Sequence, residues 1–384
     1  MNKMINTLSR RGRIAVAVTA IGAAALMLSG CGANQTGSNN GTSSGSGGSN
    51  GATKGTIGVI LPSTADSARW ESFDRPLLAS ALKADGYASN IQNAQGDAQS
   101  FSSIADQMIA SKVKALIITS PNPAVGASVE LKAKAAGIPT IDYDRVNPGG
   151  AAGYYVSFDP VEVGRLQGQA VADALKDKHG ASVIQIEGDP TDINAVAFDK
   201  GAREALDPLY KSGALTLVQD KFVLGWDNQL AGTDFEQVLT GNHGKVDGVV
   251  VANDGMAQAV ITVLQKNGLN GKVAVTGQDA TLAALQSILR GDQTMTVFKE
   301  IKRQADAAAE LAADAAAGDT AKANKFASAT IKDPKTGRVI KAVLLGSTNV
   351  NKSNVKEVVD KGYVTAKQLC SADLAKACAA AGIK

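Results

Sequence analysis

Charged, amide and aromatic side chains follow several apolar runs of this sequence, at the point where each run ends. Asp144 and Arg145 come directly after one run, Asn253 after a second and Asp279 after a third. Charged donors and acceptors make hydrogen bonds worth roughly 1.5–3 kcal/mol, and an aromatic ring offers a flat apolar surface. These side chains therefore suit a ligand that carries many polar groups.

The apolar runs are expected to be strands, because from Thr56 onward they alternate with amphipathic helical segments. Such alternation predicts parallel, doubly wound sheets, with ligands bound beyond the carboxyl ends of the strands. We therefore expect the polar residues that follow the runs to gather in one place. The expected strands cover residues 56–61, 89–94, 115–120, 139–144, 154–159, 182–188, 215–223, 246–254, 273–279, 294–299 and 338–346.

The strand–helix pattern is too long for one ordinary domain, since it extends over about 330 residues and starts again after 154–159. The sequence therefore predicts two similar α/β lobes, with the late elements crossing back to complete each sheet. The expected N-terminal lobe is 56–158 plus about 300–335, and the C-terminal lobe is 159–299 plus about 336–363. Residues 364–384 are left as a C-terminal tail.

The first thirty residues have the three parts of an export signal: a basic head, an apolar stretch and small residues before Cys31. The alternatives are a membrane anchor that stays attached, or a secretory signal with an incidental cysteine. "LSGC" fits the lipobox of bacterial lipoproteins, so residues 1–30 are expected to be a lipoprotein signal peptide and Cys31 a lipidated anchor. Residues 31–55, rich in Gly, Ser and Asn, would be a flexible linker. The protein is accordingly expected on the extracytoplasmic face of the cell membrane, attached by lipid alone.

Other chemistry-bearing residues point away from metals and nucleic acids. Cys370 and Cys378 could form a disulfide outside the cytosol or remain two unpaired buried thiols. His179 and His243 lie in polar, turn-like stretches and are expected at the surface, so we predict no metal site. The net charge of +3 includes four cations of the export signal, which leaves the rest near −1 and does not suggest a nucleic-acid partner. Motifs for nucleotide phosphates, zinc or a serine nucleophile are not found.

Several longer stretches, taken in order, resemble the sugar-binding proteins of ABC importers, in particular the D-xylose-binding branch and its multiple-monosaccharide relatives. They are "ARWESFDRPLLASALKADG", "AKAAGIPTIDYDR", "YYVSFDPVEVGRLQG", "VVVANDGMAQAVITVLQKNGLNGKVAVTGQDA" and "MTVFKEI". The resemblance implies a periplasmic binding protein type I fold, in which two lobes joined by three crossovers close on one monosaccharide. It implies xylose, or else glucose, galactose or arabinose, with no cofactor, a monomeric protein, and ABC permease transmembrane subunits as partners.

The family pattern implies ligand-binding roles for particular positions. Asp144 and Arg145 resemble an acid–base pair that grips adjacent sugar hydroxyls, the alternative being a local salt bridge. Trp70 and Trp226 would pack on the sugar's C–H faces, the alternative being ordinary core aromatics. For Asp254 a structural turn or N-cap role is expected. The remaining residues implied to bind ligand are Arg69, Asp192, Asn194, Asn253, Asp279 and Lys299.

Three other functions are alternatives to sugar capture. A glycosidase could use Asp144 and Asp279 as its two carboxyl groups, but acids paired with Arg or amides have depressed pKa values and suit binding rather than proton donation. We therefore expect a protein that is not an enzyme. A sugar-responsive repressor needs a DNA-binding segment where this chain has an export signal. A sensory subunit that presents bound sugar to a membrane kinase or chemoreceptor remains the alternative.

Overall fold

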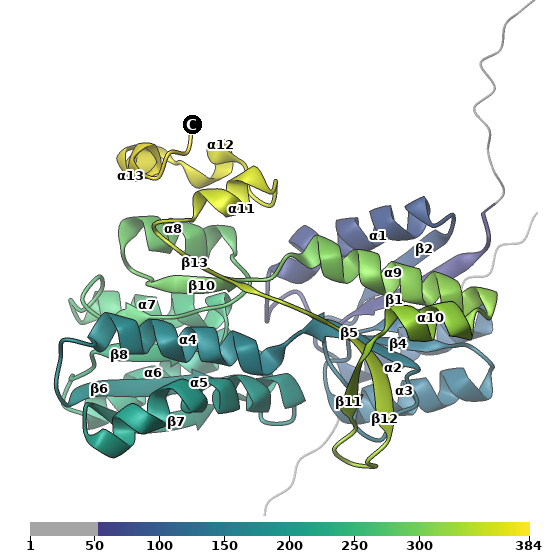
Figure 1. Ribbon diagram of the computed structural model, residues 1–384, viewed down its shortest axis with the longest axis horizontal. Coiled ribbons are helices and arrows are strands. Elements are labelled where there is room, and N and C mark those ends of the chain that lie inside the picture. The colour runs from purple at the N-terminus through teal and green to yellow at the C-terminus, as the bar shows by residue number, and fades with distance from the viewer. Residues whose placement is uncertain (1–52) are drawn as a thin grey trace, which may run out of the picture. The chain divides into compact units, whose positions relative to one another are not determined.

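The N-terminal lobe is built on one large sheet in the computed structural model, which describes residues 53–384. Its seven strands run in the order β11-β12-β5-β4-β3-β1-β2, and each neighbouring pair is parallel except β11 with β12 (Figure 1). The predicted export signal, Cys31 and residues 31–52 of the predicted linker lie outside the described residues. The strands are β1 (Thr56–Leu61), β2 (Ala88–Asn93), β3 (Leu116–Ile118), β4 (Thr140–Tyr143), β5 (Tyr154–Phe158), β11 (Ala329–Lys332) and β12 (Val339–Leu345).

Helices cover both faces of this sheet because alternate strand residues point to opposite sides. Ile57 and Val59 of β1 belong to the same buried cluster as Leu78 of α1 and the alanines of α9, whereas Ile60 packs with Phe101 of α2. Alternation along β1 thus builds one apolar core on each face. The helices of this lobe are α1 (Arg75–Ala84), preceded by a short π-helix η1 (Trp70–Asp74), α2 (Ala98–Ala110), α3 (Pro123–Ala135), α9 (Ile301–Ala317) and α10 (Thr320–Phe326).

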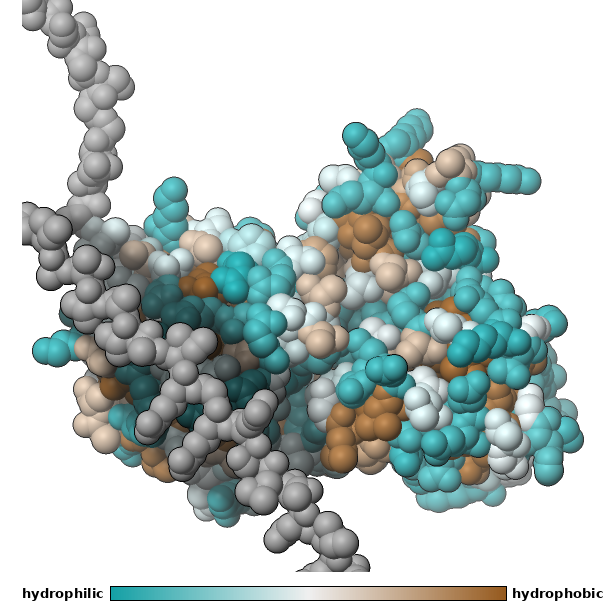
Figure 2. Space-filling model, turned by 180° about the vertical axis from the view of Figure 1, so that it is seen from behind, coloured by the Kyte–Doolittle hydropathy of each residue, from teal (hydrophilic) through white to brown (hydrophobic). Residues whose placement is uncertain are grey.

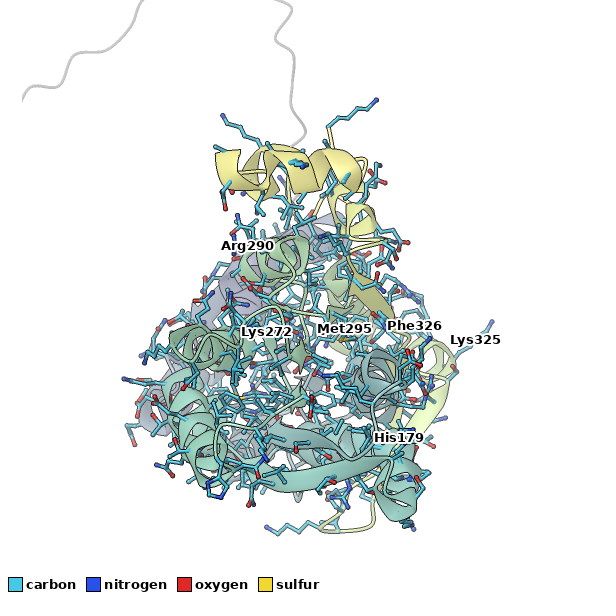
Figure 3. All side chains as sticks on the ribbon, turned by 90° about the vertical axis from the view of Figure 1, so that its left-hand side faces the viewer. His179, Lys272, Arg290, Met295, Lys325 and Phe326 are labelled. Carbon is cyan, nitrogen blue, oxygen red and sulfur yellow. A yellow bond between two sulfur atoms is a disulfide. The ribbon has the colours of Figure 1, made fainter. Side chains whose placement is uncertain are left out.

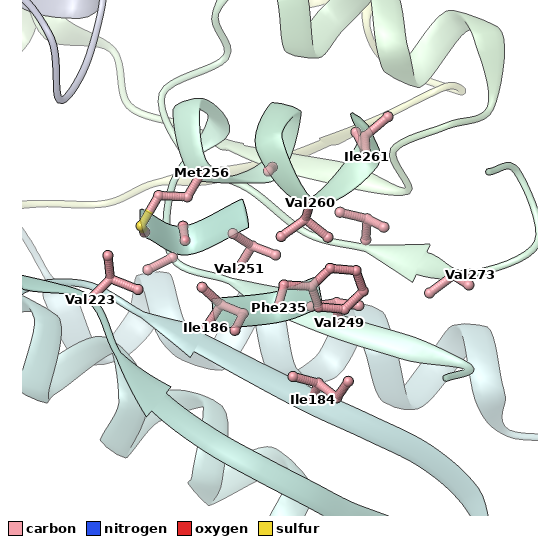
Figure 4. Close-up of a cluster of buried hydrophobic side chains, with 14 of the residues drawn as sticks. Ile184, Ile186, Val223, Phe235, Val249, Val251, Met256, Val260, Ile261 and Val273 are labelled. Atoms are coloured by element: carbon pink, nitrogen blue, oxygen red, sulfur yellow. The ribbon is translucent and has the colours of Figure 1, made fainter. Parts of the chain in front are cut away.

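The C-terminal lobe has a four-stranded parallel sheet in the order β7-β6-β8-β9. On one face, Ile184 and Val249 pack with Phe235 of α6 and Val260 of α7 (Figure 4). Two lobes with predominantly parallel, doubly wound sheets confirm the predicted fold class. The strands are β6 (Ala181–Glu187), β7 (Leu215–Phe222), β8 (Gly248–Val251) and β9 (Ala274–Val275), and the helices are α4 (Pro160–Leu175), α5 (Ile193–Ser212), α6 (Asn228–Gly241), α7 (Asp254–Lys266) and α8 (Leu282–Arg290).

Three connections join the lobes, from β5 to α4, from β10 (Met295–Phe298) to α9 and from β12 to β13 (Thr348–Asn351). Strands β10 and β13 pair antiparallel with each other. One part of the predicted division into lobes was wrong. Residues 336–363 were expected in the C-terminal lobe, but β12, which lies in this range, pairs with β5 of the N-terminal lobe. The physical reason is that β12 forms an antiparallel hairpin with β11, a strand that the sequence pattern did not predict.

The C-terminal tail packs on α8 of the C-terminal lobe. It contains α12 (Ala366–Leu369) and α13 (Ala375–Ala380), follows α11 (Lys356–Asp360), and has a disulfide that joins Cys370 to Cys378. Arg290 at the end of α8 lies beneath the tail (Figure 3) and reaches Asp373 at 3.6 Å.

The described surface is mainly polar. On the face seen in Figure 2, hydrophobic side chains form small patches among hydrophilic ones, as is usual for a globular surface. His179 (Figure 3) and His243 are exposed and lie in turn or bend segments, which confirms the prediction for both. Within residues 53–384, no helix combines the length and the apolar character needed to cross a bilayer.

Helices α4 and α5 cross with their backbones in contact. A Cβ atom on Gly201 of α5 would collide with the carbonyl oxygen of Val161, and one on Gly164 of α4 would collide with that of Phe198. This close crossing fixes the start of α5, which carries Asn194.

Replacing Gly201 with Ala should therefore lower the free energy of unfolding by about 1–3 kcal/mol, because the backbones must move apart. Urea denaturation followed by circular dichroism measures the change. Gly241→Ala is the matched control, since Gly241 also lies in a helix but faces open space. Equal stability of the Gly201→Ala variant and the wild type would show that the crossing is not tight.

Candidate ligand-binding site

The loops that follow strands of both lobes meet around one cavity of about 30 Å³. Asp144 follows β4, Asn253 follows β8, Asp279 follows β9 and Lys299 follows β10. The structure brings together all ten side chains for which the family pattern implied a ligand-binding role. They are Arg69, Trp70, Asp144, Arg145, Asp192, Asn194, Trp226, Asn253, Asp279 and Lys299.

Arg69 is the centre of the ion pairs at this cavity, and only 1% of the residue is exposed. Its guanidinium lies 2.7 Å from Asp74 and 2.9 Å from Asp144, and 3.8 Å from Asp279 of the other lobe. The Tyr143 hydroxyl donates a further hydrogen bond to Asp74 at 2.7 Å. A buried charge needs such partners, because removing it from water costs several kcal/mol.

Asp144 is held as a carboxylate. Burial alone would raise its pKa, but Arg69, Lys299 and Arg145 oppose this and hold the pKa of Asp144 at about 2. Its backbone φ of 69° lies in the left-handed region, which is uncommon for residues other than glycine. The turn directly after β4 thus directs an acceptor with full negative charge into the cavity wall.

Arg145 connects the two lobes and forms no salt bridge with Asp144 within residues 53–384, which contradicts the alternative of a local salt bridge between these two residues. Its guanidinium lies 3.1 Å from Asp66 of the N-terminal lobe and 3.1 Å from Asp192 of the C-terminal lobe. Asp66 also accepts a hydrogen bond from the indole N–H of Trp70 at 3.0 Å, and Asp192 accepts one from Trp226 at 3.2 Å. The partner that hydrogen-bonds to Asp144 is Arg69. Which acid each arginine meets depends on tertiary contacts that adjacency in the sequence does not encode.

Both tryptophans are core aromatics that also line the cavity. Trp70 is 2% exposed and Trp226 is 6% exposed, and each belongs to the apolar core of its own lobe while also lining the cavity. The Arg69 guanidinium lies over the Trp70 ring, 4.4 Å from the ring centroid.

The remaining predicted residues contribute amides and one ammonium. The Asn194 amide donates to the backbone carbonyl of Asp144 at 2.6 Å, and the Lys299 ammonium lies 3.0 Å from Asp279. Asn253 is the N-cap of α7, because its side chain accepts from the backbone N–H of Met256. Of the two roles expected for Asp254, the N-cap is therefore wrong, whereas its carboxyl group does accept from the backbone N–H of Thr281 in a turn.

Four cavity residues were not on the predicted list: Asp66, Ser67, Phe198 and Gln278. Asp66 and Ser67 lie in the loop after β1, and Gln278 adjoins Asp279 after β9. Their positions just after strands could therefore have identified all three from the sequence. Phe198 lies inside α5 and carries no such signal. The Gln278 side-chain carbonyl is buried and has no hydrogen-bond partner among the described residues.

The model of the periplasmic binding protein domain matches residues 57–320. The chain belongs to this family. It is 36% identical over 302 residues to the D-xylose-binding periplasmic protein of Haemophilus influenzae, covering 78% of this chain and 88% of that protein. The multiple sugar-binding periplasmic protein SbpA of Azospirillum brasilense is 34% identical over 82% of this chain and 91% of its own length.

Solved structures of the family share the two-lobed fold. The solute binding protein of an ABC transporter from Clostridium phytofermentans, determined with bound β-D-glucose, superposes with a TM-score of 0.73 at 28% identity. The match covers 82% of this chain and 99% of that one. The periplasmic binding protein type I fold expected from the sequence is thereby confirmed.

Replacing Arg69 with Met should lower the free energy of unfolding by about 3–5 kcal/mol, because buried carboxylates would lose their partner. Urea denaturation at neutral pH measures this loss. In the control Arg75→Met, the lost pair with Glu71 has side chains that are 34% and 38% exposed, so a loss of at most about 1 kcal/mol is expected. Similar losses in the two variants would contradict a stabilising role for the buried network.

Proposed function

We propose that this protein captures a monosaccharide between its lobes, with D-xylose as the first candidate, and delivers it to the transmembrane subunits of an ABC importer. The observation that carries the proposal is the cavity itself, where charged groups already paired with each other stand beside two indole rings. Its lining includes four carboxylates and three cationic groups: Asp66, Asp144, Asp192, Asp279, Arg69, Arg145 and Lys299.

A neutral polyhydroxyl ligand suits this arrangement better than an ion does. Sugar hydroxyls both donate and accept, so they can bond to carboxylates and to guanidinium groups without bringing a charge that needs its own partner. The free carbonyl of Gln278 would accept one hydroxyl. The names of the relatives from H. influenzae and A. brasilense support a sugar ligand, and D-xylose is named for the former.

Entry of a sugar requires the lobes to separate. A cavity of about 30 Å³ is far smaller than the roughly 300–1,000 Å³ of ligand pockets in proteins. Contacts that close the cavity join the lobes directly, such as the Ser67 hydroxyl donating to Asp279 at 2.8 Å and Asn228 donating to the carbonyl of Ala65 at 3.0 Å. A sugar that touches both lobes would favour the closed form by its differential affinity, and the permease would respond to that form.

We further propose that Cys31 is lipidated and attaches the protein to the outer face of the cytoplasmic membrane. We also propose that the protein binds its ligand without catalysing a reaction. The anchor is inferred from "LSGC" and the preceding export signal. Mass spectrometry of the protein extracted from membranes should find an acylated Cys31 as the first residue. A soluble protein that retains residues 1–30 would contradict the anchor.

A thermal-shift screen of residues 53–384 against monosaccharides tests the function directly. Ligand that binds only the folded state raises the melting temperature, by an amount that corresponds to about 2.7 kcal/mol at a hundredfold excess over Kd. We expect the largest increase with D-xylose and smaller or no increases with other sugars. No increase with any monosaccharide would contradict sugar capture, and a larger one with glucose, galactose or arabinose would replace xylose.

Arg145→Ala should weaken sugar binding by about 2 kcal/mol or more, because Asp66 and Asp192 would both lose the same buried partner. Trp226→Ala should also weaken it through loss of the apolar face. Calorimetric titration measures both variants, with Arg165→Ala as the control, since Arg165 pairs on the surface of α4 with Glu162 and, within residues 53–384, with no other acid. Unchanged affinity in a folded Arg145→Ala variant would remove Arg145 from the site.

A further inference from the structure

Asp254 is buried next to the candidate site but does not line the cavity. It is the first residue of α7, and 1% of it is exposed. One carboxyl oxygen accepts from the Thr296 hydroxyl at 2.8 Å and from the Gln293 amide at 3.1 Å. The other accepts from the backbone N–H of Thr281 at 2.9 Å. This acid therefore joins α7 to two other segments of the C-terminal lobe.

The segment that Asp254 holds is the turn of residues 277–281, which carries the cavity residue Asp279. The backbone N–H of Asp254 donates to the carbonyl of Gln278 at 3.0 Å, so the contact is made at both ends of the turn. A Cβ atom on Gly277 would collide with the Asp254 carboxyl group, so glycine permits the close approach.

The same turn has a strained backbone. Asp279 has φ 98° and Ala280 has φ 51°, both in a region that side chains other than hydrogen disfavour. Such conformations cost of order 1–3 kcal/mol each and persist only where surrounding contacts impose them. The Thr296 hydroxyl, which bonds to Asp254, also accepts from the backbone N–H of Ala280 at 3.1 Å. Asp254 and Thr296 are thus placed to impose the conformation of Asp279.

We propose that Asp254 is a positioning residue for the sugar site: it holds the turn of residues 277–281 so that Asp279 faces the ligand. The inference rests on the proposed function, because it assigns Asp254 a part in that same site. Asp254 acts through Asp279 and does not touch the ligand.

The charge state follows from the surroundings of Asp254. Burial, and next the negative charge of Asp279, raise the pKa of Asp254 to about 7. Its hydrogen-bonding neighbours Thr281, Gln293 and Thr296 are uncharged, and the cations nearest Asp279 are Lys299 and Arg69. Above about pH 7 a second negative charge would develop beside Asp279.

The sign of the pH effect is fixed by this raised pKa. Between about pH 4 and pH 7 the folded protein keeps a proton that the unfolded chain has lost, so this group's contribution to stability falls as pH rises through that range. Sugar affinity should fall as pH rises through about 7, when ionised Asp254 begins to repel Asp279.

Calorimetric titrations at pH 6 and pH 8 test the proposal, using the monosaccharide selected by the thermal-shift screen, which is D-xylose on the present proposal. The wild type should bind at least about threefold more weakly at pH 8 than at pH 6, as expected for coupling between a titrating group and a ligand. Asp254→Asn removes the titrating group and keeps one acceptor oxygen, so it should lose the difference between the two pH values. Asp254→Ala should raise Kd about tenfold or more at pH 6, because the turn loses its acceptor.

Two further variants separate positioning from general stability. Thr296→Val removes the hydroxyl that bonds to both Asp254 and Ala280, so it should raise Kd, as Asp254→Ala does. If Asp254→Ala does not fold, Thr296→Val provides the test. Tyr210→Phe is the control: Tyr210 lies on α5 in the same lobe and its hydroxyl donates to Gln185 at 3.1 Å, not to Asp254 or its partners, so Kd should stay unchanged even if the melting temperature falls.

The outcomes distinguish the inference from the function that it builds on. A wild-type pH profile retained in Asp254→Asn, or an unchanged Kd in folded Asp254→Ala and Thr296→Val, would overturn the positioning role and leave sugar capture standing. Absence of binding by the wild type to every monosaccharide at both pH values would overturn both.

Discussion

The buried guanidinium of Arg69 is the constraint on which the candidate site depends. Its partners come from three places in the sequence: Asp74 in the adjacent π-helix, Asp144 after β4, and Asp279 in the other lobe. A charge buried in this way is destabilising unless paired carboxylates surround it. The loops must therefore present those acids at fixed positions, and the contact with Asp279 extends this requirement across the interface between the lobes.

The ion pairs within the cavity wall determine which kind of ligand the cavity can bind. Asp144 keeps a pKa of about 2 because Arg69 and other cations outweigh its burial, so it acts as an acceptor and not as an acid catalyst. Arg145 lies between two further acids, 3.1 Å from Asp66 of one lobe and 3.1 Å from Asp192 of the other. With the ionic groups already paired, a ligand gains most from hydrogen bonds and from contact with the two indoles. These are the interactions that a neutral sugar provides.

The sequence predicted the fold class and the location of polar residues well, because both follow from strand–helix alternation and from the common edge of parallel strands. It did not predict the partners of Arg145, since side-chain pairing depends on where distant loops come together. Phe198 was missed because a residue inside a helix gives no local sign of facing a cavity. Strand β12 was assigned to the wrong lobe because its apolar pattern identifies a strand but not the sheet that it joins. The export signal and Cys31 lie outside the described residues, so their roles remain predictions.

The most direct test of the central claim, that internally paired charges form a site for a neutral sugar, is calorimetric titration with D-xylose at low and high ionic strength. Salt screens exposed charges over about 10 Å at 0.1 M but affects buried pairs much less. We predict that Kd changes by less than about twofold between 0.05 and 0.5 M NaCl, since no net charge is transferred with the ligand. A steep loss of affinity with salt, or tighter binding of the anionic D-xylonate than of D-xylose, would contradict the account.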